Sequence, residues 1–328
     1  MNRKTIFIFI CIFALAVLAI SPFVGSVRIP LSALFDFDRV SVESQVFYSL
    51  RLPRVLTAFL AGAALACCGV ALQAMFRNPL ATPFTLGISS GAAFGAAIFV
   101  LFASALKIPY GVILFSFLGS LSAVFLVYGF TKVRKGFSAG TMLLAGVAVN
   151  FFFSSLILFL QYMSDFTQSF RVVRWLMGSI DVSGFQTPLI FAIFTFAGIV
   201  LIAGQNLNLN LMSISDEIAI ARGVNVQKSR KLIFFATSIM VAVVVAYCGP
   251  IGFVGLMAPH ICRLLIGYDH KYLIASSVIF GGAFLTLCDT FARTLIIPAE
   301  IPVGVLTSLL GGPFFVWLLL KSSASRGL

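Results

Sequence analysis

The sequence predicts an all-α fold, a polytopic bundle of about ten transmembrane helices forming one domain over residues 1–328. The 328 residues are 60% hydrophobic and 10% charged, with a mean hydropathy of +1.10, so there is too little polar surface to cover a water-soluble globule. The apolar residues also gather in repeated runs of about twenty, which is the length of a helix that crosses a bilayer. The strands of a membrane barrel would alternate over shorter segments, so we expect helices.

The apolar runs, read against their polar and Pro/Gly breaks, define ten candidate spans. They are 5–24, 54–77, 84–106, 110–131, 139–161, 186–204, 231–251, 254–267, 271–294 and 303–321. The first resembles a secretory signal peptide, but its length, the lack of a clear cleavage site and the many later spans favour a retained anchor. The run at 254–267 is short for a full crossing, and we expect a partial or tilted helix inside the protein.

The distribution of basic residues predicts the orientation in the membrane. An even number of spans puts both termini on one side, and with that side cytoplasmic the inner face collects 14 of the 22 lysines and arginines. The net charge of +12 therefore records topology, and we expect no nucleic-acid partner.

No motif in the sequence indicates catalysis or a metal site. There is no phosphate-binding loop, no HExxH and no nucleophile elbow. The six cysteines lie inside apolar runs without CxxC spacing, and His260 and His270 lack acidic neighbours suited to zinc. We expect no catalytic residue, no metal and no cofactor in this chain.

One loop, Leu207 to Lys231, is polar but contains a short helix pattern. Ser215 can cap that helix, Asp216 and Glu217 suit the positive end of its dipole, and Gly223 suits its exit. Two turns of helix are not stable alone in water. The helix must dock either on its own membrane domain or on a separate protein, and these residues leave both alternatives open.

Polar groups within the spans are few. Asp289 and Arg293 are four residues apart near the outer end of a span, which predicts a mutually neutralising pair. A chain that pumps ions by itself usually carries carboxylates at the membrane midplane, and the middle of these spans is nearly free of them. We therefore expect the energy for active transport to come from a partner. A stand-alone secondary transporter or channel is the alternative.

Several long motifs together carry a family resemblance. They are RLPR at 51–54, GAALACCGVALQAMFRNPLATP at 62–83, LGISSGAAFGA at 86–96, LLAGVA at 143–148, GPIGFVGLMAPHICR at 249–263 and IPVGVLTSLLGGPFFVWLL at 301–319. On these motifs the chain resembles the permeases of bacterial ABC importers for iron chelates, haem and cobalamin, and the resemblance covers essentially the whole chain.

The resemblance implies a fold and a set of partners. The fold would be the transmembrane domain of a type II ABC importer in the bacterial inner membrane, with both termini cytoplasmic. The partners would be a second permease subunit in a homodimer or close heterodimer, two cytoplasmic ATPases that carry ATP and Mg, and a periplasmic substrate-binding protein. The path would follow the subunit interface, with a ferric siderophore as first choice of solute, haem second and cobalamin third.

The resemblance also assigns site residues. Arg51, Arg54 and Arg293 would dock the binding protein, although ordinary interfacial anchoring is an alternative for them. The coupling loop at 208–231 would contact the ATPase through Ser215, Asp216, Glu217, Ala219, Arg222 and Gly223. The cytoplasmic gate would comprise Asn78, Pro79 and Leu80 with Ser138, Ala139, Gly140 and Thr141. This chain departs from its relatives at Ala139 and Gly140, where they carry hydroxyls, which puts the closure of the gate in doubt.

Overall fold

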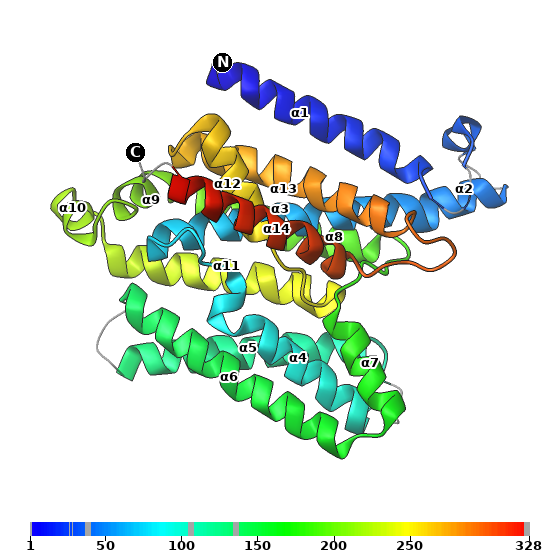
Figure 1. Cartoon of the computed structure of the whole chain (residues 1–328), viewed down its shortest axis with the longest axis horizontal. Coiled ribbons are helices and arrows are strands. Elements are labelled where there is room, and N and C mark those ends of the chain that lie inside the picture. Colours follow the sequence, from blue (N-terminus) through cyan, green and yellow to red (C-terminus); the bar gives the residue numbers. More distant parts are fainter. Residues whose placement is uncertain are drawn as a thin grey trace.

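The structure is a computed structural model that describes residues 2–25, 27, 29–36, 41–103, 108–133 and 138–324. The secondary structure of these residues is helical, and the long helices run side by side in one bundle (Figure 1). Seven helices in this described part are long and apolar enough to cross a membrane, and three further apolar helices are shorter. Together they correspond to the ten expected spans, which confirms the all-α polytopic fold.

The ten apolar helices begin and end close to the expected positions. They are α1 (Arg3–Ile20), α3 (Leu52–Phe76), α4 (Ile88–Ile98), α5 (Gly111–Val133), α6 (Ala139–Met163), α8 (Gln186–Ala203), α11 (Val226–Cys248), α12 (Val254–Ile266), α13 (His270–Ala292) and α14 (Val303–Ala324). Residues 104–106 of the third expected span lie outside the described residues. The short helix α12 packs against α3 and α13, as the length of its apolar run predicts.

Four further α-helices were not expected as spans. They are α2 (Val42–Val46), which continues through a π-helical turn into α3, the amphipathic α7 (Phe166–Leu176), and the loop helices α9 (Asn206–Met212) and α10 (Asp216–Ala221). Sequence analysis anticipated α10 but not α7. The start of α7 is set by a capping box, in which Asp165 accepts from the backbone N–H of Gln168 at 2.8 Å.

The centre of the bundle is α3, which is almost entirely buried and contacts α8, α11, α12 and α13. Small residues allow these contacts. A Cβ atom at Gly62 would lie 2.2 Å from the carbonyl oxygen of Gly281 on α13, and one at Gly69 would lie 1.8 Å from that of Gly255 on α12. Van der Waals packing of close backbones is the main attraction between helices in lipid, so these glycines fix the register of α3 against its neighbours.

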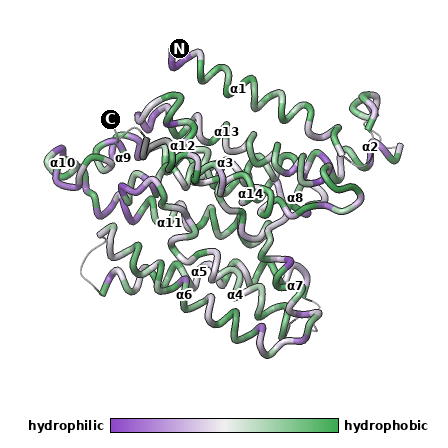
Figure 2. The backbone as a smooth tube through the Cα atoms, in the orientation of Figure 1, coloured by the Kyte–Doolittle hydropathy of each residue, from purple (hydrophilic) through white to green (hydrophobic). Residues whose placement is uncertain are grey.

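The layout defines the two ends of the bundle. The helices α9 and α10 lie at one end with the beginning of α1, and α2 lies at the other end (Figure 1). Hydrophilic residues gather around α9, α10 and the start of α11, whereas α5 and α6 are largely hydrophobic along their length (Figure 2). The polar candidate residues therefore stand at the two ends of an apolar bundle.

Candidate functional site

The end of the bundle that carries α2 holds a cluster of ion pairs centred on Arg54. Its Nε lies 3.1 Å from both carboxylate oxygens of Asp289 on α13, and its Nη2 lies 2.9 Å from Oδ1. Its Nη1 binds Glu300 Oε2 at 2.8 Å. The side chain of Asp289 is 1% exposed, while that of Glu300 is 52% exposed. One guanidinium thus joins a buried carboxylate to a surface carboxylate.

The expected ion pair of Asp289 and Arg293 forms, but it is the longer of two ion pairs to Asp289. Arg293 Nε lies 3.9 Å from Asp289 Oδ2, at the limit of an ion pair, so Arg54 is the main partner of Asp289. The spacing of four residues along α13 does bring Asp289 and Arg293 together. The close packing of α3 on α13, which the spacing cannot reveal, places the planar fork of Arg54 directly on the carboxylate.

The three arginines expected to dock a partner differ in accessibility. Arg293, expected on the outer rim, is 2% exposed, and its Nη2 donates to Ser21 O and, at 3.1 Å, to Thr290 Oγ1. Arg51 is partly exposed and donates from Nη1 to Val24 O at 3.1 Å. Arg51 and Arg54 therefore form the accessible part of the cluster, and Arg293 lies beneath it.

The opposite end of the bundle carries the helix expected in the polar loop. Ser215 Oγ accepts from the backbone N–H of Ile218 at 3.0 Å, and Gly223 adopts φ +83° where the chain leaves the helix. The backbone N–H of Glu217 and the Ser215 hydroxyl lower the pKa of the Glu217 carboxyl below its ordinary value. The structure thus confirms that Ser215 caps the start of this helix and that Gly223 forms its exit.

The loop helix α10 is held on its own membrane domain. Both oxygens of Asp216 accept from Arg230 Nη2 at 2.8 Å, and Arg230 belongs to α11 and is buried. Ala219 is fully buried on the same side. The other side exposes Ile218 and Ile220, at 42% and 62%, and Arg222. One face of α10 is therefore docked internally, and the other remains an exposed apolar surface.

The residues expected at the cytoplasmic gate lie in two separate turns. After α3, Arg77 takes φ +51°, and Asn78 Oδ1 accepts from the backbone N–H of Leu80 at 2.9 Å, which leaves Leu80 59% exposed. At the start of α6, Ser138 caps the helix by accepting from the backbone N–H of Thr141 at 3.2 Å, and its Oγ lies 2.8 Å from Thr141 Oγ1.

The other two gate positions add no polar contact. Ala139 is partly exposed, and Gly140 is exposed with open space where a Cβ would stand. The first gate turn does reach the loop helix, since Arg77 Nη2 lies 3.8 Å from Asp216 Oδ1. Arg77 itself was not among the predicted gate residues, but its ion pair places the predicted group that follows it, residues 78–80, close to the loop helix.

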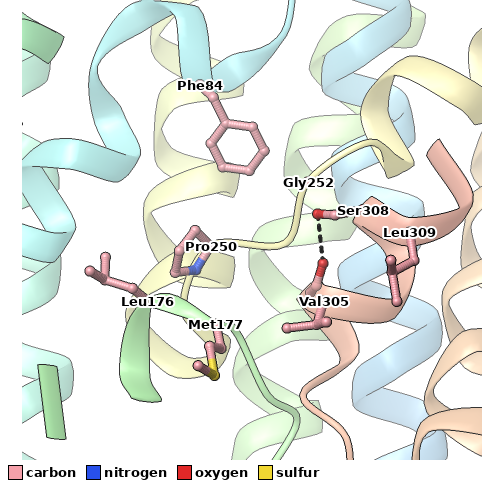
Figure 3. A pocket seen from close by; sticks show the side chains of 9 residues that line it. Phe84, Leu176, Met177, Pro250, Gly252, Val305, Ser308 and Leu309 are labelled. Carbon is pink, nitrogen blue, oxygen red and sulfur yellow. Dashed lines mark hydrogen bonds between the residues drawn. The ribbon is translucent and has the colours of Figure 1, made fainter. Parts of the chain in front are cut away.

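A cavity of about 530 Å³ lies between the 3-10 turn η4 (Pro83–Leu86), the end of α7, the turn between α11 and α12, and α14 (Figure 3). Phe84, Leu176, Met177 and Pro250 form one part of its lining, and Val305, Ser308 and Leu309 of α14 form another. Ser308 Oγ donates to Gly304 O at 2.8 Å, so the hydroxyl is occupied by its own helix. The lining is otherwise mainly apolar, so a bound molecule would be held mainly by van der Waals contacts and not by specific hydrogen bonds.

Faces of α6 and α14 are exposed and apolar. On α6 they include Leu144, Phe151 and Phe152, and on α14 Leu309 and Trp317, all at least 55% exposed. Elsewhere, no group of three His, Cys, Asp or Glu in the described part of the chain is arranged to hold a metal ion. His260 packs its ring against Phe314 and Phe315.

Comparison with known proteins decides what these features belong to. Residues 11–321 match the model of the FecCD transport family. The chain belongs to the FecCD transport family. Its bundle of apolar helices is accordingly that of a multi-pass membrane permease.

Individual relatives of this FecCD permease cover nearly its whole length. It is 36% identical over 305 residues to the hemin transport system permease protein HmuU of Yersinia pestis, covering 92% of this chain and 91% of that protein. It is 38% identical over 306 residues to the molybdate import system permease protein MolB of Haemophilus influenzae, covering 92% and 88%. It also resembles a solved structure described as an inward-facing conformation of a metal-chelate type ABC transporter, with 33% identity, a TM-score of 0.86 and coverage of 97% and 99%.

Two features of these candidate sites in the FecCD permease were not predicted from the sequence. The cavity residues Pro250, Gly252 and Gly304 stand in motifs that carried the resemblance, but nothing in them indicated that they share a cavity. The role of Glu300 as a second partner of Arg54 was also missed. Its only signal is that it is an acidic residue in the same outer region as several arginines.

Proposed function

We propose that this FecCD permease is the transmembrane subunit of a binding-protein-dependent ABC importer that moves a metal chelate from the periplasm to the cytoplasm. Two such subunits pair, and two cytoplasmic ATPases drive alternating access between outward-open and inward-open states. ATP and Mg bind the ATPases, and this chain contributes the path.

The observation that carries this proposal is the two-sided contact of α10. Asp216 fastens the helix to Arg230 and reaches Arg77 beside the first gate turn, while Ile218, Ile220 and Arg222 remain exposed. An exposed apolar patch rimmed by charge is typical of a protein interaction surface. A push on α10 by an ATPase would reach α11 and the gate turn through Asp216.

The cavity supports a bulky, weakly hydrogen-bonding solute. Its mainly apolar lining borders α14, whose exposed apolar face suits contact with a second permease subunit. We propose a ferric siderophore as first choice, haem second and cobalamin third. HmuU is named for hemin and MolB for molybdate. This chain is about equally identical in sequence to both, so the sequence identity does not indicate which solute it carries.

The test is reconstitution in proteoliposomes with the binding protein and the ATPase. Uptake of a radiolabelled ferric siderophore should require ATP and stop with an ATPase that cannot hydrolyse it. Asp216→Asn should lower uptake while leaving ATPase binding in place, and the matched control Lys228→Gln, exposed in the same loop, should not. Uptake that persists with the inactive ATPase would favour a stand-alone secondary transporter or channel.

The outer cluster is proposed as the docking site of the binding protein. Charge complementarity between Arg51 and Arg54 and carboxylates of that protein would set its registry. Glu300 already occupies one edge of Arg54, so Glu300→Gln should tighten docking, while Arg51→Glu should weaken it by about tenfold or more. Surface plasmon resonance on nanodiscs measures both, with Glu43→Gln as the acidic control, and equal affinities in all variants would remove the docking site.

A further inference from the structure

A second cavity, of about 390 Å³, lies at the end of the bundle that carries α9 and α10. It is bounded by the end of α3 and the first gate turn, by Ser213 of the polar loop, and by α12 with the turn that leads into α13. Its side chains include Arg77, Arg263, His260 and His270, and we call it the Arg77–Arg263 cavity. None of the described residues that line it is Asp or Glu.

Arg263 is oriented toward this cavity by neutral partners. Its Nη2 donates to Gln73 Oε1 at 2.7 Å, and the buried Gln73 is itself fixed by donating from Nε2 to Gly255 O at 3.3 Å. The guanidinium carbon lies 5.9 Å from the centre of the Tyr268 ring. Among the described residues no carboxylate lies within ion-pair distance of Arg263. A partly buried cation is therefore held in place without a counter-ion.

Two more residues that line the cavity have a polar group without a close partner among the described residues. His260 Nε2 is buried and has no hydrogen-bond partner in the described part of the protein, which is costly for a polar atom. Among the described residues, Arg77 has one carboxylate within ion-pair distance, that of Asp216 at 3.8 Å, and that carboxylate is bound more closely by Arg230 at 2.8 Å. Two further acids lie nearby. Glu217 is close enough to Arg77 for their charges to interact, and Asp269 accepts from Asn210 Nδ2 at 3.0 Å and from the backbone N–H of Lys271 at 3.1 Å.

We propose that the Arg77–Arg263 cavity binds a phosphate-type oxyanion, either free phosphate or the phosphate of a lipid headgroup. Two guanidinium groups present paired N–H donors that match phosphate oxygens. The occupant would supply the counter-charge that Arg263 lacks among the described residues.

The rim of the cavity is suited to a lipid source. Leu264 and Tyr268 line it and are 67% and 75% exposed. Tyrosine is enriched where membrane meets water, and basic pockets between helices on the cytoplasmic side bind anionic headgroups. A free anion would use the same guanidinium groups without needing this apolar rim.

The position of the site gives the anion a structural consequence. It would touch the gate turn through Arg77, the polar loop beside Ser213, and α12 through Arg263. A ligand that contacts three elements stabilises the arrangement in which they lie together. Binding should therefore favour the relative position of gate turn and loop seen in this structure.

The experiment measures thermal unfolding of the purified permease during titration with sodium phosphate or with sodium chloride at matched ionic strength. Phosphate should raise the unfolding midpoint more than chloride. In Arg263→Gln the half-saturating phosphate concentration should rise by about tenfold or more, since a hydrogen-bonded charge is lost, and Lys228→Gln should behave as the parent. Should Arg263→Gln fail to fold, Arg77→Gln, at a 39% exposed side chain, gives the same test.

A second arm distinguishes the sources by native mass spectrometry of permease released from phosphatidylglycerol or phosphatidylcholine nanodiscs. Selective retention of phosphatidylglycerol, displaced by phosphate and lost in Arg263→Gln, supports a headgroup site. A phosphate response without lipid retention supports a free-anion site. Equal responses to phosphate and chloride with no selective lipid retention overturn the proposal. The proposal is also overturned if Arg263→Gln weakens only the binding of the ATPase, because the residues of the Arg77–Arg263 cavity would then be a protein contact.

Discussion

The sharpest prediction concerns Asp289, the buried carboxylate near the C-terminal end of α13. Asp289→Asn keeps the volume of the side chain and removes its charge. Arg54 then loses contacts of 2.9 to 3.1 Å with a carboxylate and keeps only Glu300, while Arg293 loses its nearest negative charge. The two largely buried guanidinium groups would then share one nearby carboxylate, that of Glu300, in place of two.

The magnitude follows from the burial of the partners. Removing one member of a buried ion pair costs about 3–5 kcal/mol, because the remaining charge is left without compensation. The matched change Glu300→Gln removes the other carboxylate of Arg54, but Glu300 is 52% exposed, so its loss should cost at most about 1 kcal/mol. Asp289→Asn should therefore be the more destabilising change by at least about 2 kcal/mol.

The assay is equilibrium unfolding of the purified permease in mixed micelles, with a double-mutant cycle between Asp289→Asn and Arg54→Gln. A coupling free energy of about 1–3 kcal/mol is expected for these touching groups. The same cycle with Arg293→Gln should give a smaller coupling, since its Nε is 3.9 Å from Asp289. Equal costs for Asp289→Asn and Glu300→Gln, or additive effects of the Asp289 and Arg54 changes, would refute the reasoning.

Two further predictions concern packing and pH. Gly69→Ala should destabilise the bundle by about 1–3 kcal/mol or more, because its Cβ would lie 1.8 Å from Gly255 O. Gly129→Ala on α5 meets open space and should be neutral or stabilise by up to about 1 kcal/mol in the same unfolding assay. Similar effects of the two changes would contradict the close approach of α3 to α12. The Asp269 pKa is lowered by the hydrogen bond from Asn210 and then by the backbone N–H of Lys271, so its stabilisation is present above its ordinary pKa and lost as pH falls through the lowered value. Thermal unfolding below about pH 4 should show a shallower acid loss in Asp269→Asn, and a loss as steep as in the parent would contradict this linkage.

Local features were predictable where they depend on neighbours in the chain. The ten apolar segments, the Ser215 cap and the Gly223 exit are set by hydropathy and by backbone geometry over a few residues, and the structure has them close to where the sequence indicates. The helix α7 was not predicted because its two arginines interrupt the apolar run. An amphipathic helix of this kind does not stand out in a search for continuous apolar segments. The Asp289–Arg293 expectation omitted Arg54 because it considered one helix alone.

Taken by itself, the sequence determined that this protein spans a membrane with about ten helices, lacks a charged midplane and carries a capped helix in a polar loop, and its motifs indicated the family. Only the tertiary structure decided that Arg54 rather than Arg293 is the main partner of Asp289, that Arg293 is buried, and that Arg77 meets Asp216. The reason is physical. Hydropathy and capping act within one segment, whereas ion pairs and cavities depend on how closely separate helices approach. That distance is set by glycines that contact residues far away in the sequence, such as Gly62 and Gly281, which are 219 residues apart.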